Sequence, residues 1–126
     1  MPSARTPQEL YEIYESAAIS GDADEILALY EHDAVFIGQP GQRSEGAEEI
    51  RAALEAFQVL NPEKMTLRPT DVVECGDIAL SRSEWSLKGT TPDGEPVEIA
   101  GKGIEVLHRQ TDGSWKFLID HIFGGA

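Results

Sequence analysis

The chain has 126 residues, of which 40% are hydrophobic, and its 23 acidic and 10 basic side chains give a net charge of −13. This length and apolar content are typical of one globular domain and exclude a disordered chain, so we expect a single domain over residues 1–126. The negative charge repels phosphate backbones and anionic lipid surfaces, which excludes nucleic acid and membranes as expected partners.

The sequence also bears on the compartment of the protein. Cys75 is the single cysteine, so an internal disulfide is excluded, as fits a reducing compartment. Residues 1–7 lack the charged and then apolar pattern of a secretory leader. No apolar run approaches the roughly 20 residues that a membrane helix needs. We therefore expect a cytoplasmic protein.

The first predicted helix begins at Pro7, a residue that suits the first helical position. Thr6 is expected to cap it and Glu9 to complete a capping box, while Gly21 ends the helix. Apolar residues then recur at the helical spacing and predict one buried face. They are Leu10, Ile13, Tyr14, Ala17 and Ala18.

Two more helices are predicted before the chain changes character. Asp22 caps a short second helix, which a brief strand over residues 34–37 and a loop over residues 38–45 follow. A third helix spans roughly residues 47–60, and Asn61-Pro62 stops it.

From residue 65 onward the sequence predicts four strands, over residues 65–75, 78–88, 97–109 and 115–123. Pro69 interrupts the first of them, which favours an edge position or a bulge. Helices first and an antiparallel sheet afterwards indicate an α+β fold.

Two long segments carry a family resemblance: SGDADEILALYEHDAVFIGQPGQRSEGAEEIRAAL near the start and GIEVLHRQTDGSWKFLIDHIFG near the end. They resemble SnoaL-like and YybH-like proteins of the nuclear transport factor 2-like superfamily, which is also the ketosteroid isomerase-like superfamily. The likeness extends over about residues 7–124. It implies a cone in which three N-terminal helices pack on a strongly curved, mostly antiparallel sheet. It also implies a deep apolar pocket for a small molecule and a homodimer formed through the convex face of the sheet.

The superfamily includes isomerases, cyclases, dehydratases and hydrolases, and the YybH-like branch has no assigned activity. Steroid isomerase chemistry is excluded, because the position of the family's base aligns with Gly38 and that of its acid falls near Lys102 or Gly103. Epoxide hydrolases use an Asp-Arg-Asp arrangement. Arg82 and Asp120 could provide two of its members, and the third has no counterpart at a matching position. Asp120 also matches by position the acidic residue late in the sheet of the SnoaL-type cyclases.

Side chains alternate between the two faces of a strand, and this predicts which residues of the last strand enter the pocket. The larger and more aromatic set is expected to face inward. It consists of Trp115, Phe117, Ile119, His121 and Phe123. Asp120 is then expected on the convex face.

The turn before this strand sets its register. A three-residue loop at Thr111-Asp112-Gly113 pairs Gln110 with Ser114 and makes Glu105 and His121 diagonal neighbours on the inner face. A two-residue turn would instead place Glu105 beside Asp120. We favour the first interpretation because it sets Leu107 against Phe117.

Glu105 and His121 are therefore the candidate catalytic pair for acid–base chemistry, with Asp120 as the alternative. Two buried polar groups that only satisfy each other would fit the same pattern. A non-catalytic binding module and a dimerisation module are the alternative functions. We expect neither a metal nor a cofactor. The candidate ligand contacts are apolar or aromatic, and Trp85 serves either as pocket wall or as core filler. They are Trp85, Phe117, Ile119, Tyr14, Tyr30, Phe36 and Phe57.

Overall fold

The computed structural model describes residues 3–38 and 41–125. Its elements follow in the order α1 (Pro7–Ser20), α2 (Ala23–Leu27), β1 (Tyr30–Ile37), β2 (Arg43–Glu45), α3 (Gly46–Gln58), β3 (Lys64–Cys75), β4 (Ile78–Thr90), β5 (Pro96–Arg109) and β6 (Trp115–His121). Among the helices of the described residues, none is long and apolar enough to cross a membrane.

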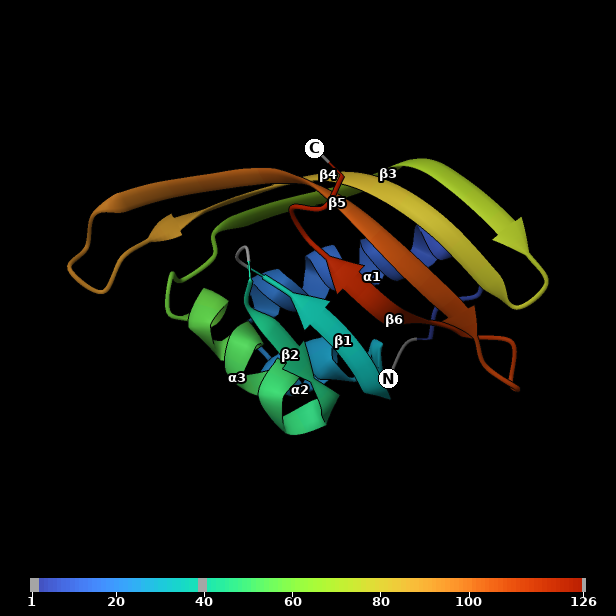
Figure 1. The fold of residues 1–126 in the computed structure, drawn as a ribbon. Helices are drawn as coiled ribbons and strands as arrows, with labels where there is room; N and C mark the ends of the chain where they lie inside the picture. The colour runs from blue at the N-terminus through green and yellow to red at the C-terminus, as the bar shows by residue number, and fades with distance from the viewer. Residues whose placement is uncertain (1–2, 39–40, 126) are drawn as a thin grey trace.

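All six strands form one sheet in the order β2-β1-β6-β5-β4-β3. Neighbouring strands are antiparallel except β1 and β6, which run parallel. Figure 1 shows β3, β4 and β5 arching over one side of the molecule, with the three helices beneath the arch. This is the predicted α+β fold, in which three helices pack on a curved and mostly antiparallel sheet.

The start of α1 shows how local sequence positions a helix. Thr6 Oγ1 accepts a hydrogen bond from the Glu9 backbone N–H at 3.1 Å, as predicted for the cap. Glu9 Oε1 accepts in turn from the N–H of Arg5 at 3.0 Å, one residue before the Thr6 N–H expected for a capping box, so the side chain of Glu9 holds the segment that leads into the helix. Gly21 ends the helix with φ 78°, a conformation that glycine adopts without strain.

Two predicted boundaries in the first half differ from the structure. The strand expected at residue 34 begins at Tyr30, and the C-terminal part of the expected loop forms the short strand β2. Both differences arise from strand pairing, since Val35 pairs with Glu45 of the next strand and Tyr30 pairs with Phe117 near the end of the chain. Residues 39 and 40 of the expected loop lie outside the described residues.

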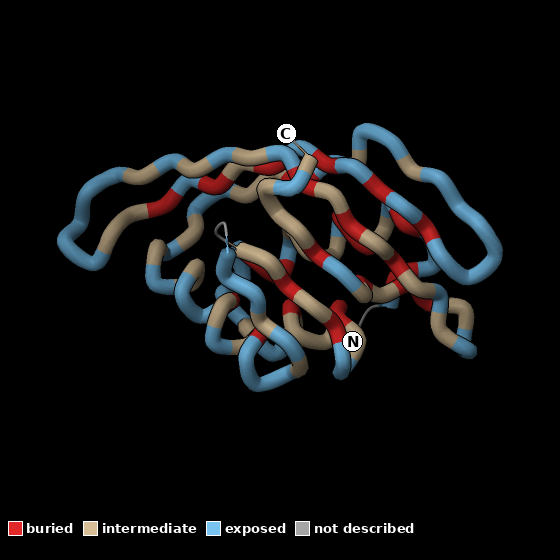
Figure 2. Tube along the Cα trace, in the orientation of Figure 1, coloured by how far each residue is buried: buried red, intermediate tan, exposed pale blue. Residues whose placement is uncertain are grey.

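The core lies between the helices and the concave face of the sheet. Along β4 buried and exposed residues alternate, and Figure 2 shows this alternation along the long strands. Phe117 is at the centre of the core, with 1% of its surface exposed. Its ring makes edge contacts with Tyr11 and Tyr14 at centroid distances of 5.7 and 5.9 Å, and a tilted contact with Tyr30 at 5.3 Å.

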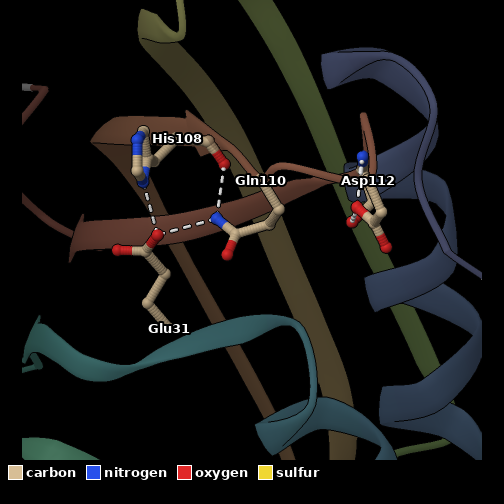
Figure 3. Close-up of polar contacts among 5 residues, drawn as sticks. Glu31, His108, Gln110 and Asp112 are labelled. Carbon is tan, nitrogen blue, oxygen red and sulfur yellow. Dashed lines mark hydrogen bonds and ion pairs between the residues drawn. The ribbon is translucent and has the colours of Figure 1, made fainter.

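The turn between β5 and β6 has the predicted three-residue form. The Gln110 N–H donates to Ser114 O at 2.7 Å, and Gly113 has φ 88°. Asp112 Oδ1 accepts from both the backbone and the hydroxyl of Ser114, at 2.9 and 2.7 Å. As Figure 3 shows, Gln110 also donates to Glu31 of β1 at 2.7 Å.

That contact belongs to a polar cluster which ties β1 to the β5–β6 hairpin. Glu31 Oε1 lies 2.5 Å from His108 Nδ1 as well as accepting from Gln110 Nε2, and the Gln110 amide also donates to the His108 carbonyl at 3.0 Å (Figure 3). The cluster therefore fixes the start of β1 to the end of β5 and to the turn that follows it.

A β-bulge at Leu118 interrupts the pairing of β5 with β6. Leu107 pairs with Phe117 as predicted, but the next residue back, Val106, pairs with Ile119. Leu118 is thus an extra residue of β6 that has no partner in β5. Beyond it, each residue of β6 faces the side opposite to the one that regular alternation predicts. Ile119 is 38% exposed, whereas Asp120 is 5% exposed.

The bulge overturns the predicted orientation of the end of this strand. Ile119 and His121 were expected to face the cavity and Asp120 the convex face, and all three placements are wrong. Glu105 pairs with Asp120, and His121 pairs with Ile104 on the outer face. The inward orientation of Trp115 and Phe117, which precede the bulge, is confirmed by their burial.

Truncation of the central ring tests this description of the core. Phe117→Ala should lower the free energy of unfolding by about 3–5 kcal/mol, because it removes a fully buried ring and leaves a cavity. Val59→Ala is the control, since Val59 is 53% exposed and the change should stay within about 0.5 kcal/mol. Chemical denaturation followed by circular dichroism measures both values. Equal losses for the two variants would contradict the assignment of Phe117 to the core.

Candidate functional site

A cavity of about 50 Å³ lies between the helices and the concave face of the sheet. Its wall is mostly apolar and comes from α1, α2, α3 and five strands. The residues that line it are Tyr11, Tyr14, Ala18, Ile26, Phe36, Leu54, Phe57, Gln58, Pro62, Met65, Leu67, Trp85, Leu87, Glu105, Phe117, Asp120 and Ile122.

Most of the candidate ligand contacts are brought together in this wall. Tyr14, Phe36, Phe57, Trp85 and Phe117 all line the cavity. Two of the predicted contacts are not among the lining residues. Ile119 faces outward because of the bulge, and Tyr30 lies behind the wall, where its hydroxyl contacts Asp120.

Two carboxylates enter this apolar space from adjacent strands. Glu105 of β5 and Asp120 of β6 are direct partners in the sheet, and they are 2% and 5% exposed. The alternative candidate Asp120 therefore shares the cavity with Glu105. The predicted neighbour His121 is half-buried outside it, so the structure does not form a Glu105–His121 pair.

Hydroxyl groups from α1 and β4 hold the Glu105 carboxylate. The Tyr11 hydroxyl donates to Oε1 at 2.6 Å and lies 2.7 Å from Ser81 Oγ. The Ser83 hydroxyl donates to Oε2 at 3.1 Å. Gly103 leaves room for this arrangement, because a Cβ at that position would lie 2.3 Å from Oε2.

Asp120 has a different set of contacts. The Tyr30 hydroxyl donates to Asp120 Oδ2 at 2.5 Å, and the Tyr14 hydroxyl lies 3.4 Å from that of Tyr30. Within the described part of the chain, Oδ1 of Asp120 accepts no hydrogen bond. One oxygen of Asp120 thus remains available to a molecule in the cavity.

Burial in this apolar site changes the acidity of both groups. Desolvation, together with the charge of Asp120, raises the pKa of Glu105 to about 8, although the bonds from Tyr11 and Ser83 oppose the change. Desolvation also raises the pKa of Asp120 to about 6, against the lowering effect of the Tyr30 bond. Between these two values the interacting pair carries one proton, which the two carboxyl groups share.

The tyrosines beside the carboxylates remain proton donors. Desolvation first, and then the nearby carboxylate charges, raise the pKa of Tyr11, Tyr14 and Tyr30 above the usual value of 10.0. Their hydroxyls therefore stay protonated at neutral pH and can stabilise negative charge on an oxygen.

Sequence reasoning missed Tyr11, Ser81 and Ser83. A signal for each was present in the sequence. Tyr11 precedes Tyr14 and Ala18 by three and seven residues, which places it on a buried face of the helix. Ser81 and Ser83 alternate with Trp85 and thus share its inward face, where a polar side chain needs a partner.

Two other arrangements are not supported by the geometry. Arg82 is exposed on the outer face of β4, so it cannot join Asp120 in an epoxide hydrolase-like triad. Within residues 3–38 and 41–125, no group of three or more His, Cys, Asp or Glu is placed to hold a metal ion.

The raised pKa of Glu105 predicts how stability depends on pH. Between pH 6 and 8 the folded protein keeps a proton on Glu105 that the unfolded chain, with a pKa of 4.5, has released. The free energy of unfolding should therefore fall as pH rises through this window, by at most about 1.4 kcal/mol per pH unit. Glu105→Gln should remove this slope, because the variant has no proton to lose.

Denaturant unfolding at a series of pH values measures the slope. Glu84→Gln serves as the matched control, since Glu84 is an exposed residue of the neighbouring strand β4 and its loss should leave the slope unchanged. A slope that persists undiminished in Glu105→Gln would show that Glu105 is not the group that binds the proton.

The sequence matches the model of the SnoaL-like domain over residues 9–117. No curated protein matches the chain. A conserved protein from Planctomyces limnophilus is similar in structure with a TM-score of 0.80 and 22% identity, over 91% of this chain and 90% of that chain. A ketosteroid isomerase-like protein from Erwinia carotovora atroseptica has a TM-score of 0.78 and 22% identity, over 90% of this chain and 88% of that chain.

A third similar structure is a nuclear transport factor 2-like superfamily protein from Salmonella enterica serovar Typhimurium. Its TM-score is 0.78 at 19% identity, over 94% of this chain and 88% of that chain. At these identities the likeness to solved structures shows the fold alone, while the family match covers most of the sequence. The chain therefore belongs to the SnoaL-like family, and its fold is that of the nuclear transport factor 2-like proteins.

Proposed function

We propose that the protein is an enzyme that moves a proton on a small, mostly apolar carbonyl compound. In this proposal Asp120 removes a proton from the carbon next to the carbonyl group, and neutral Glu105 donates a proton or hydrogen bond to the carbonyl oxygen. The observation that carries the proposal is the pair of desolvated carboxylates, Glu105 and Asp120, which share one proton in a single apolar cavity.

The different environments of the two groups support these roles. An effective base is ionised at the working pH and still basic, which a pKa of about 6 provides for Asp120. An effective acid is still protonated at that pH, as a pKa of about 8 provides for Glu105. Two carboxyl groups whose environments separate their pKa values can thus divide acid and base work between them.

The lining of the cavity supports a neutral and apolar substrate. Apart from Glu105, Asp120, Gln58 and the two tyrosine hydroxyls, the lining side chains are hydrocarbon, sulfur or indole groups. An anionic substrate would meet the negative charge of Asp120 in a low-dielectric site, where like charges repel strongly. A carbonyl compound without a formal charge avoids this repulsion.

Exchange of carbon-bound hydrogen for deuterium tests the proposal without knowledge of the natural substrate. β-Tetralone in D₂O should exchange its acidic carbon hydrogens faster with the protein than without it. Asp120→Asn should lower this rate by at least about 100-fold, the contribution expected of a general base. Proton NMR of the ketone measures the exchange, and circular dichroism confirms that the variant is folded.

His121→Ala is the matched control, because His121 is adjacent to Asp120 in the chain but lies outside the cavity. Its exchange rate should equal that of the wild type. Equal losses in both variants would contradict the assignment of the base to Asp120. Binding of β-tetralone by the wild type without any exchange would overturn the catalytic role and favour the alternative, a non-catalytic binding module.

We also propose that the chain forms a homodimer through the convex face of the sheet. Cross-strand partners there form one apolar row that extends over five strands, from the edge strand β3 to β1. The row contains Val73, Leu80, Val106, Ile119 and Val35. Val73, Leu80 and Ile119 are 56%, 47% and 38% exposed, although apolar side chains of this size are usually buried.

Charges beside the row suit a contact between two identical copies. Arg82 pairs across the strands with Asp71, and Glu84 pairs with Lys102, so both signs lie next to the apolar row. In a two-fold interface the same surface meets itself, which lets the rows pack together while Arg82 of one copy faces an acid of the other.

A charge placed in the row should separate the copies. Leu80→Glu should shift the protein from dimer to monomer, because the carboxylate would be buried without a partner in the interface. Sedimentation equilibrium measures the change. Val59→Glu is the control, since Val59 follows α3, away from this face, and is 53% exposed. A wild-type chain that sediments as a monomer at every concentration would overturn the homodimer.

A further inference from the structure

The C-terminal strap, which we define as residues 122–125, covers part of the cavity. After β6 ends at His121 the chain turns, and Ile122 becomes a lining residue. The Phe123 ring lies against the Trp85 indole with 5.4 Å between centroids. The strap therefore closes the side of the cavity at which Trp85 forms the wall.

Within the described residues, four hydrogen bonds hold the strap, and one of them, from the Gly124 N–H to His121 O at 3.1 Å, lies in the turn after β6. The Trp85 indole N–H donates to the Ile122 carbonyl at 2.6 Å. The Ile122 N–H donates to Ile37 O at 3.2 Å, and the Gly125 N–H donates to Lys102 O at 3.0 Å. Segments held by so few hydrogen bonds and half-buried side chains are those that open most readily in folded proteins.

Glycines of β5 make room for the strap. A Cβ at Gly101 would lie 2.8 Å from the Phe123 ring and 2.9 Å from the Trp85 ring. At the end of the strap, a Cβ at Gly125 would lie 2.4 Å from Gly103 O. The strap thus lies directly on the β5 backbone, in space that any larger residue at these positions would fill.

Pro62, in the loop after α3, belongs to another part of the cavity wall. The loop after α3 is bound to the end of β4, where the Thr90 N–H donates to Leu60 O at 2.6 Å and the Glu63 N–H donates to Lys88 O at 2.7 Å. A Cβ at Gly89 would lie 2.1 Å from Leu60 O, so the two backbones are in close contact. Helix and sheet segments form the remaining wall.

The size of the cavity requires that some part of the wall moves. A volume of about 50 Å³ holds only a few water molecules, whereas small-molecule sites usually measure about 300–1,000 Å³. The strap is neither helix nor strand and lines the cavity through Ile122, so its displacement enlarges the cavity without breaking a helix or a strand of the sheet.

We propose that the C-terminal strap is the gate of the cavity and that Trp85 is its latch. This inference rests on the proposed function, in that the cavity receives a small molecule. When the strap leaves, the Trp85 N–H loses the Ile122 carbonyl, and a buried N–H without an acceptor is unfavourable. A ligand that brings its own oxygen acceptor replaces that carbonyl. The gate thus selects neutral apolar molecules with a carbonyl or hydroxyl oxygen at the end that meets Trp85.

The rate of ligand entry tests the gate. In a Trp115→Phe background Trp85 is the remaining tryptophan, and its quenching by β-tetralone in a stopped-flow instrument reports entry. Phe123→Ala should raise the association rate constant by about tenfold, which corresponds to about 1.4 kcal/mol less stability of the closed strap. Gly101→Ala should act in the same direction, because its methyl group displaces the Phe123 ring without removing a strap side chain.

Ile78→Ala is the matched control, since Ile78 is 39% exposed on the outer face, and it should leave the rate unchanged. Quenching of Trp85 by acrylamide, without any ketone, should also rise in Phe123→Ala and Gly101→Ala. An association rate and an acrylamide accessibility that both stay at the wild-type level in these variants would overturn the gate.

Asp120→Asn separates this result from the proposed reaction. The variant lacks the base, so deuterium exchange should be lost, while the acrylamide accessibility of Trp85 should still rise on Phe123→Ala in the Asp120→Asn background. If Phe123→Ala speeds entry but the wild type shows no deuterium exchange, the gate is supported and the acid–base role is overturned. If β-tetralone fails to enter even the opened variants, acrylamide accessibility alone decides for or against the gate.

Discussion

The bulge at Leu118 decides which chemistry the cavity contains. With regular pairing beyond Phe117, His121 would face inward beside Glu105, and the two would form an ion pair. The extra residue turns His121 outward and brings Asp120 next to Glu105. A site with a permanent pair of opposite charges becomes a site with two acids and one shared proton, and such a site can both accept and release a proton.

Burial of two carboxyl groups destabilises the fold, and hydrogen bonds from the surrounding residues reduce this destabilisation. An ionised carboxylate in an apolar site without partners costs several kcal/mol. Hydrogen bonds from the hydroxyl groups of Tyr11 and Ser83 offset the lost hydration of Glu105, and a hydrogen bond from the Tyr30 hydroxyl does the same for Asp120. The one proton that the pair shares avoids a second negative charge in the cavity. The remaining destabilisation fits the general observation that active sites are stabilised less well than the rest of a fold.

Much of the architecture follows from local sequence signals. The Thr6 cap, the Gly21 helix end and the loop of residues 111–113 all formed as predicted, because each depends on neighbouring residues alone. The bulge could not be predicted in the same way. After Phe117 both alternating sets of residues are partly apolar, so the pattern does not select a face, and the choice depends on how β6 fits between β1 and β5.

The location of the candidate site could therefore be predicted from the sequence, but not the full set of residues that form it. Glu105 and most of the aromatic wall lie where alternation places them, since the strands before the bulge are regular. Asp120 was predicted beside Glu105 only as an alternative, which assumed a two-residue turn before the last strand. Gly101 and Gly103 are explained by contacts across the fold with Phe123 and Glu105, which no local pattern contains.

The strap and the carboxylates are linked by a single physical cause. Desolvation is the largest contribution to the raised pKa of both Glu105 and Asp120, and desolvation requires that water stays out of the cavity. A closed strap keeps Asp120 a stronger base than an ordinary carboxylate, whereas water admitted through an open strap would weaken it. An apolar ligand restores the dry environment when it replaces that water. The apolar ligands that the gate selects therefore also preserve the basicity of Asp120, on which the proposed reaction depends.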